Sequence, residues 1–311
     1  MEIAPVTVES GGRQIAFDCF DTANFITLYG ADDADALLYE MRDICMRFDD
    51  LWNFSKPNSD IARINAAEFE APVDASTAAL LQAAKEFNAI EPAFDLTVGA
   101  VSHLWKHAAQ VPSAERIARA LKDVGMDLLT LGGGVVAKAS EGVCVDVGAI
   151  AKGYIADELA RFVRGCGVSS ADIDLGGNLY LVGQHPASRP WRLEEELPAE
   201  FTFAAPRYLI EDASVSTSSN FLRAVTIDGK EYGHIISPLT GMPAKTDIAT
   251  VSVIAQSSLT ADMLSTVFLS GGSAQFEQVA ARHDGVAVVA VTFDERVLTA
   301  GFPCEFAYFV G

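Results

Sequence analysis

Residues 143–163 read VCVDVGAIAKGYIADELARFV, and their pattern changes from strand to turn to helix within this short stretch. Alternating apolar residues predict a strand over 143–147, and apolar residues at helical spacing predict a helix over 153–163. The turn between them contains the small residues Gly148, Ala149 and Ala151. A turn of this kind lets the backbone approach a ligand closely, and the N–H groups that open a helix favour an anion.

Lys152 lies in the first turn of the predicted helix. The helix macrodipole disfavours a cation at this end of a helix. The presence of a lysine here is therefore better explained if an anionic ligand binds beside it. The alternative is a solvated lysine at the end of a helix. The segment lacks the GxxxxGK[ST] spacing of a P-loop, which argues against a nucleoside triphosphate site of that type.

Outward from this stretch, helical and strand patterns are mixed without strict βαβ alternation, and this favours the α+β class. Further helices are predicted over 32–50, 76–89 with Ser76 as N-cap, 113–124 starting from Ser113, and 257–269. Strands are predicted over 15–29, 128–131, 135–138, 172–182 with an interruption at Gly176-Gly177, 224–227, 250–254, 286–291 and 306–310. No shift in composition marks a linker, so we expect one domain over 1–311, and any division into two lobes would have to be discontinuous.

The chain carries 42 acidic and 22 basic side chains, for a net charge of -20. Because no basic surplus exists, nucleic acids and anionic membranes are poor candidates for the main partner. No stretch approaches the ~20 apolar residues that span a bilayer, and residues 1–12 do not resemble a signal peptide. We therefore expect a cytoplasmic protein, or an extracytoplasmic one if a leader has been removed.

The five cysteines are scattered without a CxxC pair, which predicts reduced thiols and no zinc site.

Residues 93–99, AFDLTVG, place Asp95 and Thr97 two positions apart in a predicted turn. Both side chains could bind a ribose or a base edge from one side of the turn. The alternative is structural, since Asp and Thr in turns usually cap the local backbone.

His234 is followed by a tight turn between Pro238 and Gly241, and we expect it to lie on a strand. A histidine held by such a context can act as a general base near neutral pH. On its own, a histidine in this position would more often be structural.

Asp262 and Thr266 lie four residues apart on a predicted helix and therefore share one face. One carboxylate with a hydroxyl and backbone carbonyls suits Mg²⁺, which completes its coordination with water and substrate phosphates. The alternative is that Asp262 caps its own helix near the start.

Taken in chain order, the segments at 93–99, 146–157, 215–219 with 232–241, and 260–266 resemble the FAD:protein FMN transferase family, the ApbE-type flavin transferases. The resemblance extends from about residue 17 to residue 271 and also includes FDT at 20–22, SDIARIN at 59–65, DLGG at 174–177, and Thr217-Ser218. It implies an α+β fold with a T-fold-like core of mixed and antiparallel sheets, packed helices and an FAD cleft between them.

The resemblance also assigns roles to individual positions. Those implied to contact FAD are Phe20, Phe94, Asp95, Thr97, Asp146, Lys152, Asp157, Thr217 and Ile236. Those implied to hold Mg²⁺ are Ala149, through its carbonyl, together with Asp262, Ser265 and Thr266. His234 matches the histidine that deprotonates the acceptor hydroxyl.

The implied activity is Mg²⁺-dependent transfer of FMN from FAD to a Thr or Ser hydroxyl of a partner protein, with release of AMP. Two alternatives are an FAD pyrophosphatase on the same site and a flavin-binding module without catalysis.

The chain departs from the family pattern where HIIDP reads HIISP at Ser237, where TSG reads TSS at Ser219, and where Trp52-Asn53 replaces FS. Residues 191–196 are also more acidic than the apolar strand of the family.

Overall fold

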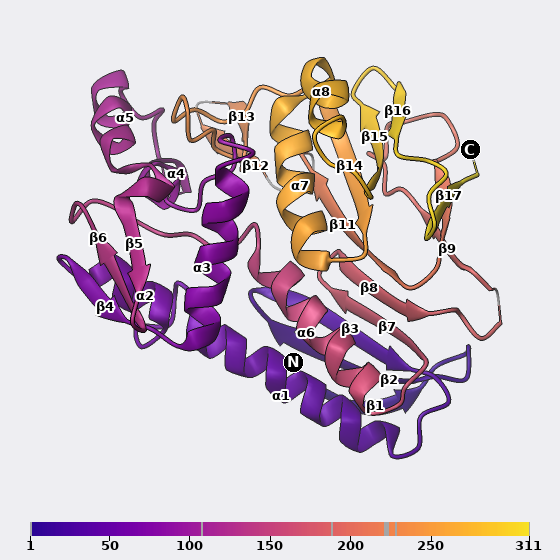
Figure 1. Ribbon diagram of the computed structural model, residues 1–311. Helices are drawn as coiled ribbons and strands as arrows, with labels where there is room; N and C mark the ends of the chain where they lie inside the picture. The colour runs from indigo at the N-terminus through magenta and orange to yellow at the C-terminus, as the bar shows by residue number, and fades with distance from the viewer. Residues whose placement is uncertain (1, 107, 188, 221–223, 228, 311) are drawn as a thin grey trace.

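The computed structural model describes residues 2–106, 108–187, 189–220, 224–227 and 229–310. Over these residues the chain forms four β-sheets with α-helices packed against them, which confirms the α+β class (Figure 1). The sheets are antiparallel throughout, not mixed, in the part of the chain that is described. A parallel pairing occurs there as an isolated bridge between Val98 and Cys144.

A nine-stranded sheet forms the centre of the molecule, in the order β1-β2-β3-β7-β8-β11-β14-β15-β16. Its strands are β1 (Glu2–Thr7), β2 (Arg13–Cys19), β3 (Thr22–Leu28), β7 (Ser170–Leu175), β8 (Asn178–Gly183), β11 (Ala213–Ser219), β14 (Ile248–Ala255), β15 (Ala287–Thr292) and β16 (Val297–Ala300). Side chains alternate between the two faces of these strands, so each face has its own set of buried residues.

Three long helices cover one face of the sheet: α1 (Ala34–Trp52), α6 (Ala151–Gly165) and α7 (Ser258–Gly271) (Figure 1). Their apolar stripes pack on residues such as Ile173 of β7 and Val253 of β14 in one hydrophobic cluster. The same cluster continues into α2 (Asp60–Ala66), α3 (Ala75–Asn88) and α8 (Phe276–Ala280). None of the described helices is long and apolar enough to cross a bilayer.

A three-stranded sheet covers part of the opposite face. Its order is β17-β10-β9, with β9 (Trp191–Glu194), β10 (Arg207–Ile210) and β17 (Ala307–Phe309). Tyr208 and Trp191 of this sheet pack with Val215 and Ile254 of the large sheet.

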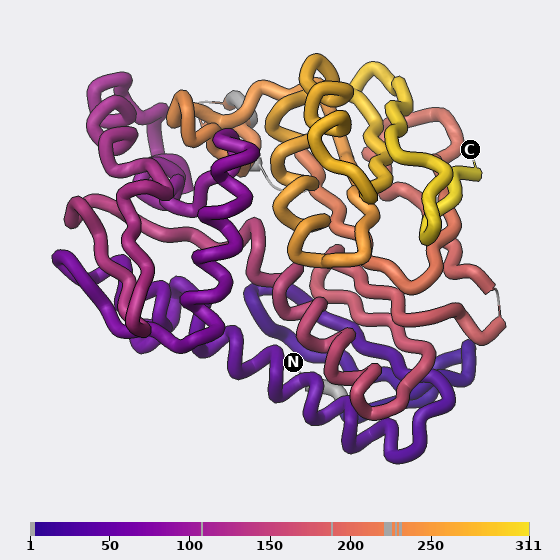
Figure 2. The backbone as a smooth tube through the Cα atoms, viewed as in Figure 1, coloured from indigo at the N-terminus to yellow at the C-terminus, as the bar shows by residue number. Residues whose placement is uncertain are grey.

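The remaining elements gather beside α3. They are β4 (Glu70–Pro72), β5 (Leu129–Gly132), β6 (Val135–Lys138), α4 (Gly99–Lys106), α5 (Ala114–Ala120), the 3₁₀ turns at Leu121–Asp123 and Met126–Leu128, and the hairpin β12 (Ala224–Ile227) with β13 (Lys230–Gly233). A further 3₁₀ turn, Ser273–Gln275, connects α7 to α8. Figure 2 shows the hairpin beside α4 and α5, although more than a hundred residues separate them in sequence. Trp105 of α4 packs on Tyr232 of β13, with ring centroids 5.4 Å apart.

The structure corrects four expectations about local structure. The strand expected over 15–29 is a hairpin, because Phe20 and Asp21 both adopt positive φ (52° and 56°) and reverse the chain. Asp74, not Ser76, caps α3, since its carboxylate accepts from the amide of Ser76. The strand expected over 143–147 is reduced to the bridge at Cys144. His234 does not lie on a strand but follows β13 in a bend.

Candidate active site

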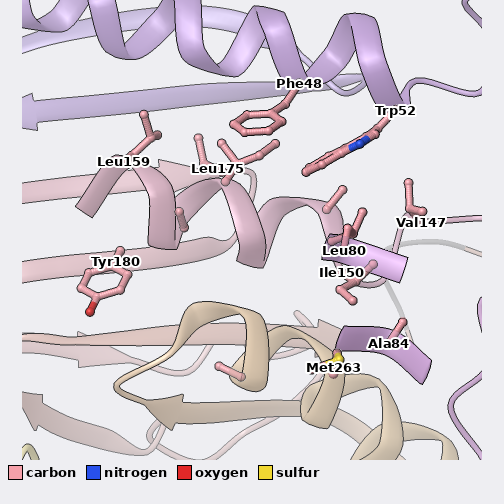
Figure 3. Packing of buried hydrophobic residues seen from close by; sticks show 14 of the residues in the cluster. Phe48, Trp52, Leu80, Ala84, Val147, Ile150, Leu159, Leu175, Tyr180 and Met263 are labelled. Atoms are coloured by element: carbon pink, nitrogen blue, oxygen red, sulfur yellow. The ribbon is translucent and has the colours of Figure 1, made fainter. Parts of the chain in front are cut away.

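The small-residue turn before α6 is held in the hydrophobic core by the two apolar residues on either side of it. Val147 and Ile150 are buried, and Figure 3 shows them beside Leu80 and Ala84 of α3, with Met263 of α7 nearby. Gly148 and Ala149 between them remain exposed and half-buried, respectively. The core therefore fixes the turn and leaves its small residues accessible.

Asn65 and the segment around Leu96 fix the chain that leads into the turn. The side chain of Asn65 bonds both main-chain groups of Val145, at 2.9 Å to the carbonyl and 2.7 Å from the amide. The amide of Asp146 donates to the carbonyl of Leu96 at 2.8 Å. At Gly99, an added Cβ would lie 2.5 Å from the carbonyl oxygen of Cys144, so the two segments can lie this close only with glycine there.

Helices α6 and α7 cap each other. The amide of Gly153, in the first turn of α6, donates to Oδ2 of Asp262 on α7 at 2.9 Å. In return, Asp157 on α6 accepts from the amides of Ser258 and Leu259, which open α7, at 2.7 and 3.1 Å. The alternative that Asp262 caps its own helix is wrong, because Asp262 caps α6, and the side chain of Ser257 caps α7.

Gly153 is required where the two helices cross. A Cβ at this position would lie 2.6 Å from the carbonyl oxygen of Ser258, 2.7 Å from Cβ of Asp262 and 2.9 Å from Cα of Leu259. These atoms belong mainly to the backbone of α7, so displacing them would require a shift of the helix. The glycine therefore sets the separation between the turn and the Asp262 carboxylate.

Several polar groups surround the carboxylate of Asp262, which is 7% exposed. Ser216 on β11 donates to Oδ1 at 3.1 Å, and Asn178 at the start of β8 donates in turn to the hydroxyl of Ser216 at 3.4 Å. Burial raises the pKa of Asp262, while the charge of Lys152 and the bonds from Gly153, Ser216 and Asn178 act in the opposite direction. Ser265, one turn further along α7, donates to the main-chain carbonyl of Asp262 at 2.9 Å.

Lys152 is half-buried in the first turn of α6. Its charge lowers the pKa of both Asp262 and Asp174, although burial has the larger, opposite effect on each. Thr266 is half-buried on the same helix as Asp262. The structure thus brings Lys152, Asp262, Ser265, Thr266 and the turn of Ala149 into one region.

Asp95 and Thr97 bond to their own surroundings. Oδ1 of Asp95 accepts from the amide and the hydroxyl of Thr97 at 2.8 and 2.5 Å, and Oδ2 accepts from the amide of Met126 at 3.1 Å. Thr97 accepts in turn from the amide of Gly125 at 2.6 Å. The ring of Phe94 is buried against Phe87, with centroids 5.2 Å apart. These hydrogen bonds hold the segment against the loop at 125–126. They correspond to the structural alternative, in which Asp95 and Thr97 cap the local backbone.

Phe20 and Asp146 lie in turns, where neighbouring groups hold their backbone. The amide of Phe20 donates to the buried carboxylate of Asp49 on α1 at 3.1 Å, and its half-buried ring packs against the main core. Asp146 accepts from the amide of Gly148 at 2.9 Å.

The loop that carries His234 is attached to α4. The indole of Trp105 donates to the carbonyl of Gly241 at 2.9 Å, and Ile236 is buried and forms a bridge with Pro243. Gly233 packs so closely on Asn220, just after β11, that a Cβ would lie 2.3 Å from its side-chain oxygen. His234 itself is exposed. The histidine is thus presented to solvent by a loop that is anchored on both sides.

Thr217 lies on the opposite face of the large sheet from Asp262. It pairs with Ser252 across β11 and β14, and their hydroxyls are 2.7 Å apart. Its neighbours Ser216 and Ser218 point to the other face, where Ser216 bonds Asp262 and Ser218 lies 2.8 Å from the hydroxyl of Ser265. The threonine that the resemblance assigned to FAD therefore has its hydroxyl directed away from the Asp262 region.

Sequence reasoning missed three residues that shape this region: Ser216, Asn178 and Asn65. Asn65 lies in the SDIARIN segment, and Asn178 directly follows Gly176-Gly177, so both were adjacent to quoted motifs. Ser216 could have been selected only with the register of β11, since alternation decides which of Ser216 and Thr217 faces α7.

The oxygen groups near Asp262 fit a hard cation such as Mg²⁺. Over the described residues, no cluster of three or more His, Cys, Asp and Glu side chains could hold a metal. One buried carboxylate with hydroxyl and carbonyl oxygens is nevertheless enough for Mg²⁺, which uses few protein ligands and prefers oxygen. The residues Ala149, Asp262, Ser265 and Thr266 supply that chemistry.

Comparisons with known proteins identify the family of this chain. The model of the ApbE family matches residues 20–290. A FAD:protein FMN transferase of Treponema pallidum is 31% identical over 86% of this chain and 80% of its own length, and one of Escherichia coli is 30% identical over 86% and 75%. Among solved structures, the ApbE protein of Thermotoga maritima superposes with a TM-score of 0.83 at 26% identity, over 93% of this chain and 97% of that one. The flavin transferase ApbE of Vibrio cholerae gives a TM-score of 0.80 at 25% identity, with the same coverage. The chain belongs to the ApbE family.

Proposed function

We propose that this protein transfers the FMN half of FAD to a Thr or Ser hydroxyl of another protein in a Mg²⁺-dependent reaction. The acceptor oxygen forms a bond to the phosphorus of the FMN phosphate, the bond to the AMP phosphate breaks, and AMP leaves with the electron pair. The hydroxyl proton passes to a base on the enzyme. The observation that carries the proposal is the contact between the start of α6 and Asp262, since it joins an anion-favouring helix end to a cation-favouring carboxylate.

Residues at the start of α6 would bind the two phosphates of FAD. The positive end of the α6 dipole and the charge of Lys152 would attract the pyrophosphate. Asp262, Ser265, Thr266 and the carbonyl of Ala149 would hold Mg²⁺. When bound, the ion would polarise the attacked phosphate and stabilise the charge that develops on AMP.

His234 would accept the proton of the acceptor hydroxyl. A hydroxyl is a poor nucleophile until a base takes its proton, and histidine suits this role near neutral pH. The exposure of His234 supports the assignment, because the substrate hydroxyl arrives on another protein. We further propose that FAD lies in a cleft of a T-fold-like core, between the His234 loop and the start of α6. Phe20, Asp146 and Ile236 would contact the bound FAD.

The test is incubation of the purified protein with FAD, MgCl₂ and an acceptor domain that carries an exposed Thr or Ser, followed by intact-mass spectrometry and chromatography of the nucleotides. The proposal predicts an acceptor heavier by one FMN moiety and one AMP released for each transfer. Free FMN and AMP without modified acceptor would indicate a pyrophosphatase, and intact bound FAD would indicate a binding module.

A further inference from the structure

We propose that Asn178 and Ser216 are positioning residues, which orient the Asp262 carboxylate toward a divalent cation at the start of α6. The proposal rests on the proposed function, because it deepens the metal site assigned there. Neither residue touches the reacting atoms; both act through Asp262.

The first observation is where the three side chains lie. Ser216 is 2% exposed and Asn178 is 1% exposed, beneath α7 on the adjacent strands β11 and β8. Ser216 donates to Oδ1 of Asp262 at 3.1 Å, and the side-chain amide of Asn178 donates to the hydroxyl of Ser216 at 3.4 Å. The amide of Gly153 holds the other oxygen, Oδ2, at 2.9 Å. Both oxygens are therefore fixed from the protein side, and the rotation of the carboxylate is restricted.

The second observation is that the direction of these bonds is determined. Ser258, at the start of α7, donates its hydroxyl to Oδ1 of Asn178 at 2.6 Å. The amide nitrogen of Asn178 therefore faces Ser216, with 3.4 Å to its hydroxyl. A reversed amide would place an oxygen against this hydroxyl, whose proton is already donated to Asp262. Since Asp157 holds the amide of Ser258, the chain of bonds is anchored at the helix start.

The third observation is that neutral donors surround this carboxylate at close range. In the described part of the chain, none of the ion pairs includes Asp262. A buried carboxylate usually has a cationic side chain or a metal beside it. Each carboxylate oxygen also has more lone pairs than one donor uses. Lys152 acts on Asp262 through its charge but forms no ion pair with it. A divalent cation would use the remaining lone pairs and add positive charge directly at the carboxylate.

Ser214 provides a matched control for the loss of a buried hydroxyl. It lies two residues before Ser216 on the same face of β11 and is fully buried. Its hydroxyl donates to the main-chain carbonyl of Leu179 at 2.7 Å and so satisfies an ordinary backbone group. Ser214→Ala therefore removes a comparable bond on the same strand without touching Asp262.

The experiment measures Mn²⁺ binding by electron paramagnetic resonance, which reports free Mn²⁺, for the wild-type protein and for the variants S216A, N178A and S214A. Outer hydrogen-bond partners of metal ligands typically change metal affinity by about 10- to 100-fold. We expect the dissociation constant for Mn²⁺ to rise at least about tenfold in S216A and in N178A, and to stay at the wild-type value in S214A. Urea unfolding without metal establishes that each variant is folded.

Activity gives an independent measurement. In S216A, the Mg²⁺ concentration that gives half-maximal transfer should rise, while the rate at saturating Mg²⁺ should recover toward that of the wild type. Wild-type Mn²⁺ affinity in a folded S216A would overturn the proposal, as would equal losses in S216A and S214A, or the absence of Mn²⁺ binding by the wild type. If the wild type binds Mn²⁺ through this network but transfers no FMN, the proposed function fails while the positioning role stands.

Discussion

Gly153 and Asp262 are joined by a hydrogen bond of 2.9 Å between residues that lie 109 positions apart in sequence. The bond brings the small-residue turn at the start of α6 against the helix that carries the candidate metal ligands. It is matched by the bonds from the start of α7 to Asp157, so each helix supplies a carboxylate to the N-terminus of the other. This pairing satisfies helix-end amides and also places an anion-binding turn beside a carboxylate.

Replacing Asp262 should separate its structural role from its role in metal binding. Asp262→Asn keeps an oxygen for the amide of Gly153 and turns its NH2 toward Ser216, whose hydroxyl can accept as well as donate, so the free energy of unfolding should change little. Asp262→Ala removes the cap and should cost about 1–2 kcal/mol. Both variants should lose FMN transfer by about 100-fold or more, because neither offers a carboxylate to the cation. Urea unfolding and Mg²⁺ titration of transfer measure the two effects, and full activity in Asp262→Ala would rule out the metal assignment.

His234→Ala should abolish transfer without releasing FAD. Loss of a general base costs about 10²- to 10⁴-fold in rate, whereas the exposed imidazole adds little to cofactor binding. Rates come from the mass assay and FAD affinity from the quenching of flavin fluorescence. Weak FAD binding in the variant would contradict the role of His234 as a base.

Gly153→Ala should disturb the site through packing alone. The new Cβ would meet Ser258, Asp262 and Leu259 at 2.6–2.9 Å, so α6 and α7 must move apart. Such overpacking typically costs about 1–3 kcal/mol, and Mn²⁺ affinity should fall with it. Gly165→Ala, in the last turn of the same helix, is the control, since nothing lies within 4 Å of its Cβ. We expect that variant to retain Mn²⁺ affinity and to be as stable as the wild type; an equal loss in both variants would argue against the close crossing.

The stability of the protein should fall as the pH rises toward neutrality, because of two buried acids. Burial raises the pKa of Glu195 to about 7, and burial together with the charge of Asp174 does the same for Asp172. The folded protein therefore binds these protons more tightly than the unfolded chain, whose carboxyl groups titrate near ~4. Their stabilising effect is complete below that unfolded value and is lost as the pH rises through about 7.

Glu195→Gln tests this effect, because it keeps the shape of the side chain and removes its titration. Urea unfolding between pH 5 and pH 8 should show a wild-type loss of about 1–3 kcal/mol for this group, and a shallower slope in the variant. Asp172→Asn should act in the same direction, since Oδ1 of Asp172 is buried without a hydrogen-bond partner among the described residues. Parallel slopes in the wild type and both variants would show that these acids are not the cause.

The long helices were predictable from the sequence, whereas the turns and the site contacts depended on tertiary structure. Apolar residues at helical spacing correctly predicted four helices, α1, α3, α6 and α7. The buried stripe of each helix is long enough for its periodicity to be clear in the sequence. The hairpin at Phe20-Asp21 was missed because both residues adopt positive φ without a glycine to signal it. The strand expected over 143–147 fails because its neighbours are Asn65 and the 94–99 segment, not a sheet.

The candidate site shows the same division. The residue types near Asp262 suggested a cation, but no local pattern could reveal that its partner is an amide on another helix. The choice between Ser216 and Thr217 also required the register of β11 against β14, since neighbouring residues face opposite sides of the sheet. The roles assigned to FAD contacts, and the description of the chain as a single domain, stay predictions.

The most direct test of the account is the location of a bound cation. Crystals soaked with Mn²⁺ and ADP, which supplies two linked phosphates, would be measured for anomalous scattering from manganese. The account predicts one strong peak bonded to the carboxylate of Asp262 and to a phosphate oxygen, beside the turn at 146–153. A peak remote from Asp262, with the diphosphate bound away from the start of α6, would contradict it.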